Sequence, residues 1–272
     1  MKHAIPVGRT SAVAIGVISI IGVASFLWPF IAPSDSFVVA HSTDAPILFA
    51  ALIPLVLVVV LAQLADGGMN AKSIALLGVL AAVIAALRPL GAGLGGIEPI
   101  WVIVILAGRA LGPGFGFVLG SVSLFVSAMF TGGVGPWLPF QMLAAAWVGL
   151  GAGLLPKARG GREILLLGVY STAAMVAYGF ILNLWFWPFS INLPEQIAFA
   201  PDAGLTENLG AWIRFNIATS LGFDIPRAFL TVLLIVVAGR PILFLLRRAS
   251  RQAAFGAPVT FDPLNQRAPA SS

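Results

Sequence analysis

The sequence contains no cysteine and only two histidines, His3 and His41. A chain without thiols cannot form disulfides, iron–sulfur clusters or zinc sites with cysteine ligands. Two histidines also leave no imidazole to spare for a buried metal or for acid–base chemistry. Most classes of enzyme therefore lose their usual residues, and we expect no catalytic residue, no metal and no cofactor.

Charge is scarce as well. Asp, Glu, Lys and Arg make up 9% of the 272 residues, whereas soluble proteins carry about 25%. Hydrophobic residues reach 59% and the mean hydropathy is +1.01, so a fold in water would expose more apolar surface than its polar groups could cover. Several apolar runs approach the ~20 residues that a helix needs to cross hydrocarbon. The chain is therefore predicted to be an all-α polytopic membrane protein whose solvent is the lipid bilayer.

Apolar runs and the breaks between them predict about eight transmembrane helices. The run at 99–110 is the short one, since helical residues rise about 1.5 Å each and this run reaches only about 18 Å, against about 30 Å of hydrocarbon. We expect it to be a tilted half-span. The predicted spans are 11–31, 45–65, 72–87, 99–110, 113–131, 136–155, 163–187 and 225–246.

The charged residues separate by side when the chain is threaded through a membrane in this way. Twelve of the fifteen Lys and Arg residues fall on the side of the termini with three acidic residues, while three basic and seven acidic residues fall on the other side. Cytoplasmic loops collect Lys and Arg, so both termini are predicted to be cytoplasmic. The basic residues form no cluster interleaved with aromatic residues, so no nucleic-acid partner is expected.

Three loops on the predicted outer side are long and rich in glycine, proline and aromatic residues, namely 88–98, 131–137 and 188–210. The cytoplasmic loops are short connections, so the working face is predicted to point outward. Residues 211–221 form an amphipathic stretch that we expect at the membrane interface. The polar tail at 249–272 is expected to be disordered.

Two motifs bring small residues together. The run IALLGVLAAVIAAL at 74–87 places Ala81 four residues before Ala85 and Ala82 four residues before Ala86, which gives a flat strip that another helix can approach closely. Packing inside the same chain is the alternative explanation. The run LAGRALGPGFGFVLG at 106–120 lacks the lysine of a phosphate-binding loop, so it predicts a tight turn followed by a helix with a small-residue face, and not nucleotide binding. Its Arg109 is expected to snorkel or to hold lipid headgroups.

Amides and tryptophans gather where the spans approach the outer side. Gln141 lies about one turn inside the run GVGPWLPFQM, and NLWFWPFSIN at 183–192 adds two amides and two tryptophans. An amide in hydrocarbon seeks a hydrogen-bonding partner, which is either another helix or a bound solute. The tryptophans are explained in part by an aromatic belt at the interface. Together these groups could stack a flat solute and bind its polar edge. The candidate substrate-binding residues are Arg88, Glu98, Trp137, Gln141, Asn183, Trp185, Trp187 and Asn192.

Residues 72–248 resemble the substrate-binding S component of energy-coupling factor (ECF) vitamin transporters. The resemblance is carried by the alanine-rich helix, by GRALGPGFGFVLG, and by GVGPWLPFQM followed by GLGAGLLP. It implies a six-helix core at 72–248 preceded by a two-helix extension at 1–71, in the membrane of a bacterial cell. The extension departs from the commonest six-helix plan, which leaves open whether it contacts the coupling subunit, another partner or only lipid.

The resemblance also implies a mechanism. An S component captures a micronutrient in an outward pocket and then topples against a transmembrane coupling subunit that is driven by two cytoplasmic ATPases, without hydrolysing anything itself. In the family the small-residue strip of the first core helix packs on the coupling subunit, which corresponds here to Ala81, Ala82, Ala85 and Ala86. Three outer loops cap the pocket and match 88–98, 131–137 and 188–210. The chain most resembles components associated with cobalamin or its precursors, although the candidate pocket suits riboflavin-like and other heteroaromatic vitamins equally.

Two other classes of function remain open. A membrane-embedded enzyme, such as a lipid-modifying transferase or an intramembrane protease, would need an ionisable residue or an activated serine within a span, and none is expected in the middle of one. A structural subunit of a membrane complex would bind no solute and would tolerate loss of the outer aromatic residues.

Overall fold

The computed structural model describes residues 7–31, 71–91 and 95–252, together with positions 5, 54, 57, 58, 61 and 62. All regular structure in these residues is helical, which confirms the all-α prediction. Five helical segments are long and apolar enough to cross a membrane, so the chain is a multi-pass membrane protein. They are Arg9–Ile31, Ala71–Gly91, Pro113–Thr131, Gly161–Phe189 and Leu221–Ser250.

Seven of the eight predicted spans have a counterpart among the described helices. The exception, 45–65, lies outside the described residues apart from a few isolated positions, and the tail beyond 252 lies outside them too. The helices are α1 (Arg9–Ile31), α5 (Ala71–Leu87), α6 (Ile100–Leu111), α7 (Pro113–Thr131), α8 (Leu138–Leu154), α9 (Gly161–Phe186), α10 (Leu205–Thr219) and α11 (Leu221–Gln252), with short 3₁₀ turns η1 (Arg88–Gly91), η2 (Trp187–Phe189) and η3 (Glu195–Ile197).

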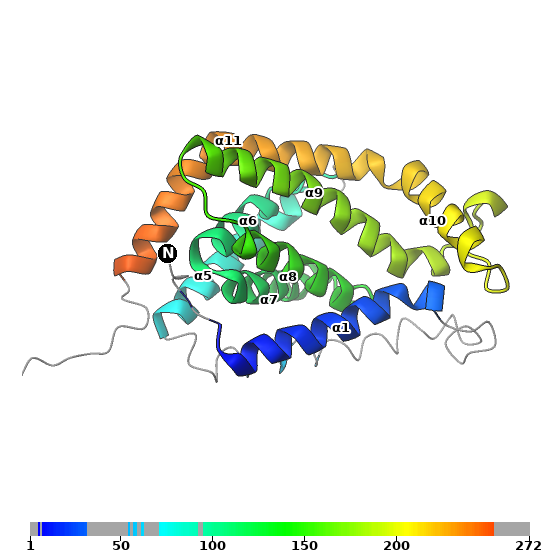
Figure 1. The fold of residues 1–272 in the computed structure, drawn as a ribbon, viewed down its shortest axis with the longest axis horizontal. Helices are drawn as coiled ribbons and strands as arrows, with labels where there is room; N and C mark the ends of the chain where they lie inside the picture. Colours follow the sequence, from blue (N-terminus) through cyan, green and yellow to red (C-terminus); the bar gives the residue numbers. More distant parts are fainter. Residues whose placement is uncertain are drawn as a thin grey trace, which may run out of the picture.

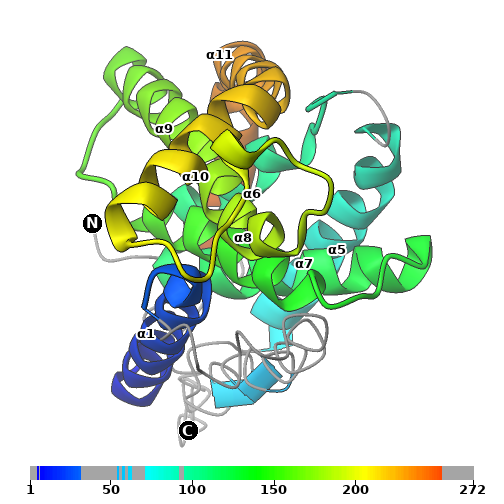
Figure 2. The same ribbon diagram turned by 90° about the vertical axis from the view of Figure 1, so that its right-hand side faces the viewer.

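Helices α6, α7 and α8 form the centre of the molecule, and the other helices lie around them (Figures 1 and 2). Helix α5 packs on α7, α9 packs on α8 and α11, and α11 also packs on α6. The start of α1 and the end of α11 lie at one end of the long axis, whereas α10 lies at the other, hereafter the α10 end (Figure 1).

Helix α6 has the short length that was predicted, at 12 residues. Nine of these residues are buried, because α5, α7, α8 and α11 all contact this helix. Protein groups satisfy carbonyls at its carboxyl-terminal end: the Ile5 backbone N–H donates to the Leu111 carbonyl oxygen at 3.0 Å, and the Gly112 N–H donates to the Gly108 carbonyl oxygen at 3.0 Å. A helix too short to cross hydrocarbon is therefore sheltered inside the protein.

Glycines allow the backbones of the central helices to touch. A Cβ atom at Gly116 of α7 would overlap the backbone of Gly149 in α8, and the reverse also holds. A Cβ atom at Gly108 of α6 would also overlap the Gly149 carbonyl oxygen, and one at Gly120 would overlap the Ala145 carbonyl oxygen. The predicted small-residue face of 106–120 thus packs within the molecule, against α8.

Helix α1 is attached to the core by specific contacts. The rings of Phe26 and Phe140 pack edge to face at 4.9 Å, and the Trp147 indole N–H donates to the Ser19 hydroxyl at 3.0 Å. Gly22 makes room for the Leu143 side chain. The first helix of the N-terminal extension therefore has one face against α8 and α9.

The carboxyl-terminal region differs from the sequence prediction in two ways. The last span was predicted at 225–246, but α11 runs for 32 residues and includes Pro226 and Pro241. At about 1.5 Å per residue it reaches about 48 Å, so it extends beyond a hydrocarbon layer of about 30 Å. The amphipathic stretch expected at 211–221 begins earlier, at Leu205, and ends at Thr219, and its buried face contacts η3 and α11.

The contact between α7 and α8 can be tested with a single methyl group. Gly149→Ala should lower the free energy of unfolding by about 1–3 kcal/mol, because the helices must move apart. Gly78→Ala is the matched control: nothing lies within 4 Å of a Cβ added there, so stability should stay the same or rise by up to about 1 kcal/mol. Equal stabilities of the two variants in detergent unfolding would contradict the close contact.

Candidate functional site

A buried cluster of charges lies toward the α10 end of the bundle. The Arg227 guanidinium donates through Nε to Glu98 Oε2 at 3.0 Å and through Nη1 to Asp224 Oδ1 at 2.6 Å. Asp224 is 1% exposed and Arg227 is 8% exposed. Glu98 Oε2 also accepts a hydrogen bond from the Trp101 indole at 2.6 Å. The two buried charges, Asp224 and Arg227, are thus paired with one another and with the half-buried Glu98, as burial of charge requires.

Three segments bring this cluster together. Asp224 and Arg227 are three residues apart on α11, so they share one face of the helix. Gly179 of α9 has no side chain, and a Cβ there would overlap the Asp224 carboxylate. Gly96, with φ at +84°, brings the loop before α6 against the backbone of Phe223. These two glycines let the loop and α9 approach the charged face of α11.

Aromatic rings close one side of the cluster. The Arg227 guanidinium lies 5.3 Å from the centre of the Tyr178 ring, and Tyr178 packs edge to face on Trp101 at 4.4 Å. A guanidinium over an aromatic face is stabilised electrostatically. The cluster therefore joins α9 and α11 to the start of α6.

A pocket of about 650 Å³ opens beside this cluster, between α9, the end of α10, the start of α11 and the segment that follows η2. Its wall is mostly aromatic and aliphatic, with a few polar groups. The lining residues are Gly179, Leu182, Asn183, Phe186, Phe189, Ser190, Ile191, Leu193, Phe215, Thr219, Ser220, Phe223, Asp224 and Arg227.

Asp224 lines this pocket, and one oxygen of its carboxylate is buried without a hydrogen bond. Its Oδ1 accepts from Arg227, whereas Oδ2 is buried and makes no hydrogen bond within the described part of the chain. Ser220, one turn earlier on the chain, accepts a hydrogen bond from Asn183 and lies close enough to Asp224 to interact with it. Buried acceptors without a donor are rare in proteins, so Oδ2 is a candidate contact for a ligand.

Asn183 is held firmly at the pocket wall. Its amide nitrogen donates to Asn216 Oδ1 at 2.8 Å and to Ser220 Oγ at 2.6 Å. Asn216 in turn donates to the Trp212 carbonyl oxygen at 2.8 Å, which fixes its orientation. The amide that the sequence singled out thus both joins helices and lines a pocket.

The other predicted site residues lie around this pocket and do not line it. Arg88 donates a hydrogen bond to Gln141 Oε1 at 2.8 Å, and this bond joins η1 to α8. Glu98 reaches the pocket only through Arg227. Asn192 is exposed and has a φ of 58°, which is a turn conformation.

The three tryptophans belong to two other clusters. Trp137 and Trp185 approach one another at 6.5 Å, and Trp185 packs on Phe140 at 5.8 Å. Asn183 and Trp185 are two residues apart, which is about 200° around a helix, so they face different neighbours. Trp187 is fully buried, and its indole donates to the Ile197 carbonyl oxygen at 2.7 Å.

The four alanines of α5 divide between two faces. Ala81 and Ala85 are buried within the molecule, where α5 packs on α7, whereas Ala82 and Ala86 are exposed. Ala75 and Gly78 extend the exposed face along the helix.

Sequence analysis missed Asp224 and Arg227. It assigned Asp224 to an outer loop before a span starting at 225, but the structure places both residues inside α11 and buried. The spacing Asp-x-x-Arg was a usable signal, because it puts opposite charges on one face of a helix.

The prediction for Arg109 was wrong. Instead of reaching lipid headgroups, its Nε donates to Glu163 Oε1 at 2.7 Å and its Nη1 to the Leu155 carbonyl oxygen at 2.9 Å. Glu163 is buried and also accepts from Arg247, at 2.6 and 3.0 Å. A second ionic cluster therefore joins α6, α9 and α11 at the end opposite α10.

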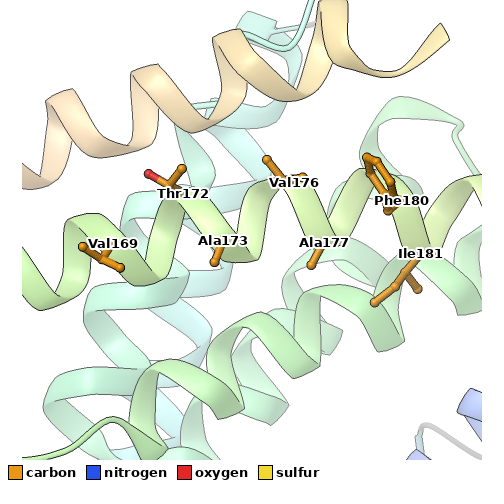
Figure 3. A pocket seen from close by; sticks show the side chains of 7 residues that line it. All are labelled: Val169, Thr172, Ala173, Val176, Ala177, Phe180 and Ile181. Carbon is orange, nitrogen blue, oxygen red and sulfur yellow. The ribbon is translucent and has the colours of Figure 1, made fainter. Parts of the chain in front are cut away.

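A second cavity of about 770 Å³ runs along α9 (Figure 3). Its lining is apolar except for Thr172, so it offers little that could orient a polar solute. The lining residues are Val169, Thr172, Ala173, Val176, Ala177, Phe180 and Ile181. Among the residues that the structure describes, no group of three or more His, Asp or Glu side chains could hold a metal ion.

Comparison with known proteins identifies one family. The family model described as "ECF transporter, substrate-specific component" matches residues 72–239, which is more than half of the chain. The match begins at the residue where the sequence resemblance begins, and it leaves α1 outside. Neither a curated protein nor a solved structure matches the chain.

Removal of Arg227 should destabilise the protein strongly. Arg227→Leu would leave Asp224 and Glu98 without their shared cation, which should cost about 3–5 kcal/mol in the free energy of unfolding. Arg214→Leu on neighbouring α10 is the control, because Arg214 is exposed and makes one hydrogen bond, to the Gln196 carbonyl oxygen; its loss should cost less than about 1 kcal/mol. A small effect of Arg227→Leu in detergent unfolding would show that the cluster adds little stability.

Proposed function

Because the chain belongs to the family of ECF transporter substrate-specific components, we propose that it captures a vitamin or related micronutrient at the α10 end of the bundle. It then delivers this solute through a transmembrane coupling subunit worked by two ATPase subunits. The protein acts in the plasma membrane of a bacterial cell.

The observation that carries this proposal is the pocket beside Asp224. Ligand sites are concave and mostly apolar, with a few polar groups that fix orientation. This pocket has that composition, with Asn183 and Asp224 as fixed polar groups among phenylalanines. An ionisable residue within a membrane helix that has an unused oxygen is a candidate for solute recognition.

The distribution of charge supports an outward orientation of the α10 end. The opposite end, where α9 begins and α11 ends, carries a concentration of basic residues, which typically marks the cytoplasmic side. They are Lys157, Arg159, Arg162, Arg240, Arg247 and Arg248. The start of α1 lies at that same end (Figure 1), in keeping with cytoplasmic termini.

The volume of the pocket favours a compact solute. About 650 Å³ lies within the range of about 300–1,000 Å³ that is usual for small-molecule sites. A corrin ring with its side groups takes up more space than this pocket encloses. We therefore favour a flat heteroaromatic micronutrient over cobalamin, the substrate favoured by the sequence resemblance.

The exposed face of α5 is the proposed contact with the coupling subunit. Ala75, Gly78, Ala82 and Ala86 leave a shallow strip on which another helix can pack closely. Ala81 and Ala85 are buried inside the molecule, so they do not belong to this exposed strip.

Solute capture can be tested by mass spectrometry of small molecules retained by the purified protein. Asn183→Ala should weaken binding of the retained solute by roughly ten to a hundredfold, because a fixed polar group of the pocket is lost. Asn192→Gly is the control, since Asn192 is exposed, lies outside the pocket and has a positive φ that glycine tolerates. If no solute is retained or bound, a structural role or membrane-embedded catalysis would be favoured instead.

The coupling face can be tested by matched pairs of substitutions. Ala82→Leu with Ala86→Leu should abolish co-purification with the coupling subunit while solute binding persists, because bulky side chains hold helices apart. Ala81→Leu with Ala85→Leu should instead destabilise the isolated protein by overpacking the contact with α7. Co-purification that survives the first pair would exclude this face.

A further inference from the structure

We propose that the pocket selects solutes whose inner end carries positive charge and donates N–H hydrogen bonds, such as an amidinium, an aminopyridinium or a protonated amine. Asp224 Oδ2 is the acceptor for this group. The inference rests on the proposed function, because it assumes that this pocket holds the solute.

The first argument is the state of the carboxylate. Asp224 is 1% exposed and lines the pocket, and one of its two oxygens has no hydrogen bond within the described residues. At the opposite end of the bundle, by contrast, both oxygens of the buried Glu163 accept from arginine. A buried oxygen without a donor costs free energy, which a bound N–H group would recover.

The second argument is the charge of the cluster. Glu98 and Asp224 share the single guanidinium of Arg227, so the three side chains together carry one net negative charge. The nearby Arg88 donates to Gln141, which does not line the pocket. A cationic solute would neutralise the cluster, whereas a carboxylate solute would add a second excess negative charge in a poorly hydrated place.

The third argument is that three neutral polar groups of the wall have already used their hydrogens. Ser190 and Thr219 donate their hydroxyl hydrogens to the carbonyl oxygens of Phe186 and Phe215, at 3.2 and 2.7 Å. Asn183 donates both amide hydrogens, to Asn216 and Ser220, and therefore has only its carbonyl oxygen left for a ligand. The donors that remain in the wall belong to Ser220, which lies beside Asp224, and to Arg227, which binds Glu98 and Asp224. The other polar groups of the wall offer acceptors, which match a solute rich in donors.

The aromatic wall fits the same class of solute. Phe186 and Phe215 lie 6.5 Å apart at the pocket, and Phe189 and Phe223 add further rings to its lining. Aromatic faces stack on flat rings and attract cations. The pocket is therefore suited to a flat ring that carries a cationic, hydrogen-bond-donating substituent.

Three small probes of one shape separate charge from fit: benzamidine, benzamide and benzoate. Their binding to the full-length protein in detergent, freed of retained solute, would be measured by saturation-transfer NMR and calorimetry. Benzamidine should bind at least about tenfold more tightly than benzamide, and benzoate most weakly, because a charge-assisted hydrogen bond is worth that much. Benzoate binding as tightly as benzamidine, or no binding by any probe, would overturn the inference.

Asp224→Asn assigns the preference to one side chain. It keeps the shape of the side chain but removes its charge, so the advantage of benzamidine over benzamide should fall about tenfold or more. Glu207→Gln is the matched control, because Glu207 is an exposed acidic residue of α10 and its loss removes the same charge from the same end. An equal loss in both variants would show that the preference comes from the general field of the protein. Should Asp224→Asn fail to fold, the order of the three probes on the unmodified protein still decides the question.

The two proposals can fail separately. If the probes show no preference for a cation while a retained solute depends on Asn183, the capture function stands and the solute class is wrong. If neither the probes nor any retained solute responds to changes in the pocket, the assignment of this pocket as the capture site fails.

Discussion

The close contact between α7 and α8 sets the dimensions of the whole bundle. Lipid gives helices no hydrophobic reason to associate, so close packing must hold them together. Gly116 and Gly149 let two backbones touch, and Gly108 brings α6 to the same place. With these three helices so close, α6 can be too short to span the membrane, because its neighbours shield it from lipid. The remaining helices then pack on the outside of this centre.

Charge inside the bundle is tolerated only where partners from other segments meet it. Arg109, Glu163 and Arg247 satisfy one another at the end opposite α10, and Glu98, Asp224 and Arg227 do so at the α10 end. The two clusters differ in one respect that matters for function. The Glu163 carboxylate is fully engaged by protein donors, whereas the Asp224 carboxylate keeps one oxygen for the pocket. One cluster is therefore complete as it stands, and the other has an oxygen left for the proposed solute.

Hydropathy predicted the spans well, because lipid imposes length and apolar composition directly on the sequence. The family resemblance was confirmed by the match over 72–239. The partners of the buried charges could not be predicted in the same way, since hydropathy cannot show that Glu98 or Gly179 will meet Arg227 and Asp224 from elsewhere in the chain. For the same reason a spacing of four identified two alanine strips on α5 without showing which of them faces α7. Asn183 was found because an amide among apolar residues needs a partner, although its partners Asn216 and Ser220 lie more than 30 residues away.

Ion pairs join α11 to the α6 segment at both ends of the bundle. At the α10 end Arg227 binds Glu98 directly, and at the other end Arg109 and Arg247 both bind Glu163 of α9, so the movement of α11 is restricted. Sliding α11 past α6 by one turn, about 5.4 Å, would separate ion pairs at both ends of the bundle. Such a movement is therefore costly, because it leaves the buried Arg227 and Glu163 without their partners. The segment from η2 to α10 walls the pocket without contributing a charge to either cluster, so a change in its position would alter the pocket without breaking any of these ion pairs.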